Sequence, residues 1–140
     1  MILLDTDHFS AFQRRGVRAG TLRDRMRARA AEPFALTIVT AEEEMRGWIA
    51  AIHRAPAGPD QVRFYESLLA LFRSLGKWTL IPFDSIAAER FLDLKRRGIR
   101  VGTMDLKIAA ISLAHDALLL SANLRDFQAV PDLRVENWLD

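Results

Sequence analysis

Short apolar runs alternate with stretches of helical periodicity along the chain, and this alternation limits the folds that the sequence can adopt. Strands are expected at residues 2–4, within 34–39, at 78–81 and at 117–120, with a short edge strand at 133–135. Strands separated by helices pair in parallel, and the helices cover the faces of the sheet. The sequence therefore predicts one α/β domain over residues 1–140, built on a mostly parallel sheet.

A helical hairpin is expected between the second and third strands. Apolar residues mark one helix face at Met45, Trp48, Ile49 and Ile52, and another at Val62, Tyr65, Leu69 and Phe72. The segment 56–59, which contains two Pro and one Gly, interrupts the helical pattern between these faces without any strand pattern. Trp48, Phe64 and Phe72 give the hairpin a large aromatic surface, which either a partner or ordinary core packing could cover.

Arginine dominates the basic residues, with 17 Arg against 3 Lys, and the sequence pI is about 9.5 although the formal net charge is only +2. The guanidinium group binds phosphate through two parallel hydrogen bonds, so this bias favours a phosphate-bearing partner. One group comprises Arg14, Arg15, Arg18, Arg23, Arg25, Arg27 and Arg29, and a second comprises Lys95, Arg96, Arg97 and Arg100. Each group could instead form a solvated helix face.

The composition also excludes several kinds of site. Without cysteine the chain has no disulfide, no thiolate zinc site and no cysteine nucleophile. No run approaches the roughly 18 apolar residues of a membrane span, and the N-terminus lacks the basic start and long apolar core of a signal peptide. We therefore expect a cytoplasmic protein that does not bind membranes.

Polar residues recur where apolar strand runs give way to helices. Asp5, Glu43 and Asp105 take such positions, and Asn123 takes a fourth. The carboxyl ends of parallel strands meet at one crevice, so these side chains are expected to converge there. Closely spaced carboxylates repel unless a cation neutralises them, and a set of oxygen ligands suits Mg²⁺ or Mn²⁺ better than zinc.

Taken singly, each acid also has a structural explanation. Asp5 or Asp7 could cap the following helix, and Asp105 could favour the dipole of its first helical turn. The segment 40–43 matches a capping box, in which the Glu43 side chain would accept a hydrogen bond from the backbone N–H of Thr40. Gly47, which costs about 1 kcal/mol of helix propensity relative to Ala, suggests that some group approaches that helix face closely.

Four sequence motifs, in their order along the chain, resemble the motifs of PIN-domain proteins. They are Leu-Leu-Asp5-Thr-Asp, Thr40-x-x-Glu43-x-x-x-Gly47, Gly102-Thr-Met-Asp105-x-x-Ile-Ala-Ala and Ser121-Ala-Asn123-x-x-Asp126-Phe127. The C-terminal run from Val130 to Trp138 is also similar to the end of VapC-type toxins. The resemblance implies a PIN-like three-layer α/β/α fold with a mostly parallel central sheet of four to five strands and an inserted helical hairpin.

The resemblance also implies a function: a Mg²⁺-dependent (or Mn²⁺-dependent) endoribonuclease, the toxin of a VapBC pair, that cuts RNA and blocks translation. Transfer RNA is a common target of similar toxins. A small antitoxin encoded nearby would neutralise the protein, which is expected to form a homodimer. The resemblance assigns catalytic roles to Asp5, Glu43, Asp105 and Asn123.

Asp5 and Asp105 are the principal metal ligands in this assignment, with Glu43 as a further ligand or as the residue that orients or deprotonates the attacking water. Asn123 occupies a position where the family often has Asp, and it brings no charge. The resemblance therefore leaves open whether one or two metal ions bind, and Asp126 could supply the missing charge. The basic residues that we expect to contact RNA are Arg23, Arg27, Arg97, Arg100, Lys107 and Arg125.

Two other functions remain open from the sequence. A degenerate PIN-like module could bind RNA or protein without cutting, and the neutral Asn123 supports that alternative. An aspartate-nucleophile phosphatase would use Asp5 as nucleophile and Asp7 as acid, with Ser121 as the hydroxyl residue. That family also needs a later Lys, and no Lys follows Ser121.

Overall fold

Five strands form a single, entirely parallel sheet in the computed structural model, which describes all 140 residues. They are β1 (Ile2–Leu4), β2 (Phe34–Thr37), β3 (Leu80–Ile81), β4 (Leu118–Leu120) and β5 (Arg134–Glu136), in the spatial order β3-β2-β1-β4-β5. The chain builds from β1 to one edge of the sheet and then returns to the other side of β1. The order therefore reverses between β1 and β4, and ligands of open α/β sheets bind beyond the strand ends at such a point.

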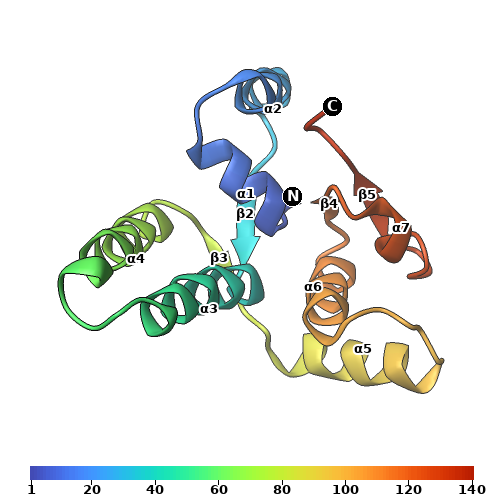
Figure 1. The fold of residues 1–140 in the computed structure, drawn as a ribbon. Helices are drawn as coiled ribbons and strands as arrows, with labels where there is room; N and C mark the ends of the chain where they lie inside the picture. The colour runs from blue at the N-terminus through green and yellow to red at the C-terminus, as the bar shows by residue number, and fades with distance from the viewer.

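Helices cover both faces of this sheet (Figure 1). They are α1 (Thr6–Gln13), α2 (Val17–Ala28), α3 (Ile38–Arg54), α4 (Val62–Leu75), α5 (Ser85–Arg96), α6 (Thr103–Ala114) and α7 (Leu124–Phe127), with a 3-10 turn, η1 (Pro59–Gln61). Alternate strand residues point to opposite faces. Leu3 packs in a core with α5 and α6, whereas Ile2 and Leu4 pack with α1, α2 and α4. The predicted three-layer α/β/α architecture is confirmed.

The transition from β2 to α3 differs from the prediction. The strand expected within 34–39 ends at Thr37, and α3 begins at Ile38. Thr37 is the N-cap, because its Oγ1 accepts a hydrogen bond of 3.0 Å from the backbone N–H of Thr40. The capping box over residues 40–43 is therefore wrong, and Glu43 lies in the second turn of α3, where the cap does not use it.

The predicted hairpin is confirmed, with α3 and α4 lying side by side (Figure 1). The apolar face of α4 nevertheless points to solvent. Its residues are each about half exposed: Val62 at 52%, Tyr65 at 55%, Leu69 at 50% and Phe72 at 51%. The helix is anchored instead by Leu71 and Leu75, which are buried. Trp48 packs partly against the core, so core packing holds for Trp48, whereas this chain does not cover the exposed Phe72.

Two further sequence expectations concern α3 and α6. No atom of the chain outside the neighbouring helix backbone lies within 4 Å of the position that a Cβ would take at Gly47, so the expected close approach is not made by this chain. Helix α6 is buried from Leu106 to Ser112 apart from Lys107, as its apolar sequence predicts. None of the helices has the length and apolar character needed to cross a membrane.

Candidate active site

The predicted acids gather at the carboxyl ends of β1 and β4. Asp5 directly follows β1, and Glu43 lies in the second turn of α3. Asp105 lies in the first turn of α6, which follows α5 with no strand between them, so the expectation that each acid follows a strand is wrong for Asp105. Their charges act on one another: both Asp5 and Asp105 raise the pKa of Glu43, and Asp105 also raises the pKa of Asp5. The sheet thus brings together residues that are 38 and 62 positions apart in the chain.

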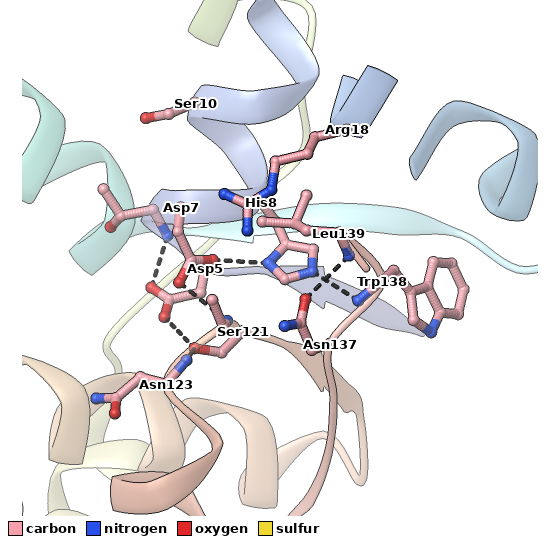
Figure 2. Close-up of polar contacts among 12 residues, drawn as sticks. Asp5, Asp7, His8, Ser10, Arg18, Ser121, Asn123, Asn137, Trp138 and Leu139 are labelled. Carbon is pink, nitrogen blue, oxygen red and sulfur yellow. Dashed lines mark hydrogen bonds and ion pairs between the residues drawn. The ribbon is translucent and has the colours of Figure 1, made fainter. Parts of the chain in front are cut away.

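Asp5 is the most buried of these acids, with 5% of its surface exposed. One carboxylate oxygen, Oδ1, accepts a hydrogen bond of 2.6 Å from the Thr6 N–H and caps α1, as one alternative predicted. The other, Oδ2, accepts a hydrogen bond of 2.7 Å from the Ser121 hydroxyl (Figure 2). Burial, followed by the charge of Asp7, raises the pKa of Asp5 to about 6. A residue needed only as a cap would not have to be a buried carboxylate in an acidic cluster.

Glu43 has one satisfied and one unsatisfied oxygen. Oε2 accepts a hydrogen bond of 3.1 Å from the Thr6 hydroxyl, whereas Oε1 is buried and has no hydrogen-bond partner in the chain. Burial is the main cause that raises the pKa of Glu43 to about 6. An unpaired buried carboxylate oxygen is costly, and it is expected where a ligand supplies the missing partner.

Asn123 joins two further acids. Its side-chain amide donates to Asp105 Oδ2 at 3.3 Å and to Asp126 Oδ2 at 3.0 Å. Burial raises the pKa of Asp105, and the hydrogen bond from Asn123 opposes that rise. Asn123 therefore contributes N–H donors to this site and links Asp105 to Asp126.

The side chains do not form a closed metal cage. Nowhere in the chain do three or more His, Asp or Glu side chains stand close enough to hold one ion. The acids therefore lie close enough to raise one another's pKa values, but three of them do not lie close enough to bind one ion together. Mg²⁺ commonly uses one or two carboxylates and keeps several waters. The donor set, with the unpaired Oε1 of Glu43, fits such a hydrated ion.

A hollow of about 400 Å³ opens beside the acids, lined by Glu43, Arg46, Gly102, Thr103, Met104 and Asp105. Arg46 pairs with Glu42 at 2.7 Å. We did not predict Arg46 as a site residue, although its spacing of three from Glu43 places both on neighbouring rows of α3. We also did not predict that Thr6 and Ser121 would donate hydrogen bonds to the acids. Their positions could have indicated it, since each lies at a strand end beside a predicted site residue.

The predicted RNA-contacting residues fall into two sets. On α2, Arg23 donates to the carbonyl of Phe12 at 2.5 Å and lies over its ring, and Arg27 pairs with Asp24. The other four residues come from segments that flank Asp105 or Asn123. Arg100 and Arg125 are exposed and form no ion pair, Arg97 pairs with Asp93 at 3.7 Å, and Lys107 lies over the rings of Phe83 and Phe91.

Three more arginines of the first group, Arg18, Arg25 and Arg29, also have partners within the chain. Arg18 pairs with Asp140 at 3.3 Å, and Arg25 donates to the carbonyls of Asn137 and Asp140. Arg29 lies over the ring of Trp138, 5.7 Å from its centroid. These contacts attach the C-terminal residues to α2. The arginines therefore stabilise the fold, a role that the sequence did not predict.

Comparisons with known proteins agree with this architecture. No protein-family model matches the chain. It is 37% identical over 46 residues to ribonuclease VapC2 of Rickettsia felis (33% of this chain, 34% of the relative). It is 30% identical over 87 residues to ribonuclease VapC2 of Haemophilus influenzae (59% of this chain, 66% of the relative). The matches thus span less than two thirds of either relative's length.

The fold similarity extends over the whole chain. A chain in the crystal structure of VapBC2 from Rickettsia felis, bound to a DNA fragment from its promoter, superposes with a TM-score of 0.72 at 22% identity and covers 99% of both chains. This likeness establishes the fold, and the sequence matches connect that fold to the VapC proteins. In sequence the chain is thus similar to VapC ribonucleases over part of their length, and in fold it is similar over its whole length to a chain of a VapBC complex.

Proposed function

We propose that this protein is a divalent-metal-dependent endoribonuclease, the toxin of a VapBC-type toxin–antitoxin pair. The observation that carries the proposal is the gathering of Asp5, Glu43 and Asp105 beside the topological switch point, with all three pKa values raised. Such perturbed acids cluster at catalytic sites. The curated relatives are named ribonucleases, which agrees with this chemistry.

Asp5 and Asp105 would hold the ion, with Glu43 beside it. A bound Mg²⁺ or Mn²⁺ would neutralise the carboxylates and polarise the phosphodiester. Thr6 fixes one oxygen of Glu43 and leaves Oε1 unpaired, so Oε1 is the atom that can orient the attacking water and accept its proton. A carboxyl pKa of about 6 suits proton transfer near neutral pH.

The contacts of Asn123 favour one ion over two. Its amide already bridges Asp105 and Asp126 through hydrogen bonds, and it adds no negative charge for a second cation to neutralise. Asp126 would then act by supporting Asn123, and the alternative in which Asp126 binds metal directly requires that this hydrogen bond break.

RNA would approach over the hollow beside Glu43 and Asp105. Arg46, Arg97, Arg100, Lys107 and Arg125 lie on the segments around these acids and could contact its phosphates. We do not assign this role to Arg23, because its guanidinium is held by the Phe12 carbonyl and lies over the Phe12 ring. Transfer RNA is a candidate target, and sequencing of RNA 5′ ends after brief expression would identify the cut.

A partner protein is also part of the proposal. The solved structure from Rickettsia felis is a VapBC complex, and here the exposed apolar face of α4 offers a surface that an amphipathic antitoxin segment could cover. A second copy of the chain is the other candidate for that face. Since RNA is the proposed substrate, we place the activity in the cytoplasm.

Cleavage of a defined single-stranded RNA tests the activity. Purified wild-type protein should cut it only with Mg²⁺ or Mn²⁺, and water as nucleophile should leave no cyclic phosphate on the products. Asp5→Asn and Asp105→Asn should lose at least 100-fold in rate, an order-of-magnitude expectation for electrostatic groups, whereas Asp24→Asn on α2 should cut like the wild type. Undiminished cleavage by both site variants would contradict the assignment.

The two alternatives have distinct signatures. A module that binds without cutting would show RNA binding but no cleavage under any metal. A phosphatase would need Asp7 free as an acid, yet both of its oxygens accept hydrogen bonds, from His8 and from the Ala122 N–H. Detection of an aspartyl-phosphate at Asp5 would restore that alternative.

A further inference from the structure

His8 is a fully buried polar residue that the proposed chemistry does not use. Its Nε2 accepts a hydrogen bond of 3.0 Å from the backbone N–H of Trp138, and its Nδ1 lies 2.6 Å from Asp7 Oδ1 (Figure 2). A backbone amide can only donate, so Nε2 carries no proton. The ring proton is therefore on Nδ1, and it is donated to Asp7.

Asp7 carries this contact to the loop that follows β4. Its second oxygen, Oδ2, accepts a hydrogen bond of 2.9 Å from the Ala122 N–H. The residues on either side of Ala122 contact the acids directly. Ser121 donates to Asp5, and Asn123 donates to Asp105. The Asn123 N–H also donates to the Ser121 hydroxyl at 3.0 Å, which ties the two residues together.

The other end of the chain of hydrogen bonds is a well-anchored segment. The Trp138 residue is 3% exposed, and its ring lies edge-on to Phe34 at 6.3 Å. Arg18 and Arg25 bind the neighbouring terminal residues. The amide that selects the tautomer of His8 is thus held in place from several directions.

We propose that His8 is a positioning residue for the acid site. The C-terminal segment fixes its ring, the ring fixes Asp7, and Asp7 fixes residues 121–123, which set the placement of Asp5 and Asp105. This inference rests on the proposed function, since its value to the protein is a correctly spaced pair of ligands. Neither His8 nor Asp7 needs to touch the ion or the RNA.

Packing alone would not require a histidine here. The adjacent Phe9 is equally buried and fills the core against Trp78, with ring centroids 5.8 Å apart. Phe9 makes no polar contact with the acid site, so it is a matched control: a substitution there disturbs the same helix and the same core without breaking the hydrogen bonds.

The test compares His8→Leu with Phe9→Leu in the full chain. Mg²⁺ affinity is measured by calorimetry, and exchange of the Ala122 amide is followed by NMR. Loss of a residue that supports metal ligands typically weakens binding by roughly 10–100-fold. We expect that loss in His8→Leu and unchanged affinity in Phe9→Leu, together with faster exchange at Ala122 only in His8→Leu. Equal affinities and equal exchange in the two variants would overturn the proposal.

A second pair of variants covers the case in which His8→Leu does not fold. The amide of Asn can replace Nδ1 as donor to Asp7, whereas Gln can replace Nε2 as acceptor from Trp138. His8→Asn should therefore bind Mg²⁺ more tightly than His8→Gln, and the reverse or an equal affinity would contradict the proposal. If the wild type binds no Mg²⁺, the metal-dependent function fails, and the Ala122 exchange still decides whether His8 positions the loop.

Discussion

Replacing Asp5 by Asn should stabilise the metal-free protein at neutral pH. Burial raises the pKa of Asp5 from 3.8 to about 6, which means that the folded protein disfavours the charged form. Asn keeps the shape of the side chain without the charge. Its oxygen can accept from the Thr6 N–H, and its amide can donate to the Ser121 hydroxyl oxygen in place of the present bond.

The size and pH dependence follow from this pKa. A tenfold change in proton affinity corresponds to about 1.4 kcal/mol, so the shift amounts to about 3 kcal/mol as an upper figure. Between pH 4 and 6 the folded wild type retains a proton that the unfolded chain has lost. Its stability therefore falls as the pH rises through this window, and the full penalty is present above pH 6. Asp5→Asn should be about 1–3 kcal/mol more stable at pH 7.5 and nearly equal to the wild type at pH 4.

Denaturant unfolding in EDTA at both pH values measures this difference. At about 3 °C per kcal/mol for a chain of this size, thermal unfolding should show a rise of roughly 3–9 °C at pH 7.5. Asp24→Asn is the control, because that residue is exposed on α2 and its ion pair with Arg27 should contribute less than about 1 kcal/mol. The reasoning is refuted if Asp5→Asn is destabilised at pH 7.5, or if its advantage is the same at both pH values.

Three further predictions concern the site and its surfaces. Glu43→Gln should reduce RNA cleavage at saturating Mg²⁺ while leaving Mg²⁺ affinity within about tenfold, because we assign Glu43 mainly to the water; a larger fall in affinity would make it a primary ligand. Neutralising Arg97 and Arg100 together should lower the salt dependence of single-stranded RNA binding by roughly 1.4, at about 0.7 for each phosphate contact, whereas neutralising Arg27 should not change it. Phe72→Glu should abolish binding of the cognate antitoxin and leave RNA cleavage by the free toxin unchanged; retained binding would place the antitoxin elsewhere.

The alternation of strands and helices was sufficient to locate the sheet. Every expected strand is present within two residues of its predicted bounds. The apolar runs that form β1, β2 and β4 are buried in the sheet, as in other parallel sheets, whereas β5 is a largely exposed edge strand. Parallel strands place their carboxyl ends at one edge, which accounts for Asp5 after β1 and Asn123 after β4, but Asp105 follows no strand because α5 leads directly to α6. The sequence did not predict which residues donate hydrogen bonds to the acids. Thr6, Ser121 and Asn123 come close to their carboxylate partners only in the folded chain.

Local patterns gave two wrong or incomplete results. The capping box at Thr40 matched a common motif, but Thr37 lies one turn earlier and takes the cap, which a pattern restricted to four residues cannot distinguish. The stripe on α4 has the spacing of a core-facing surface, and periodicity does not tell a face that is buried within the chain from one that a partner covers.

Charge patterns were the least informative part of the sequence. The arginines of α2 suggested a phosphate-binding helix, yet several of them bind the C-terminal residues, more than 100 positions away in the chain. His8 had no motif around it that indicated its contacts. Its role depends on the amide of Trp138, and such long-range pairing of a side chain with a backbone group leaves no periodic trace in the sequence.

Binding of Mg²⁺ to the purified protein tests the central claim most directly, because the whole account depends on these acids sharing a cation. Calorimetric titration should show one binding event for the wild type and for Asp24→Asn, with affinity at least tenfold weaker in Asp5→Asn and in Asp105→Asn. Equal Mg²⁺ affinity in the wild type and both site variants, or no binding to any of them, would contradict the account.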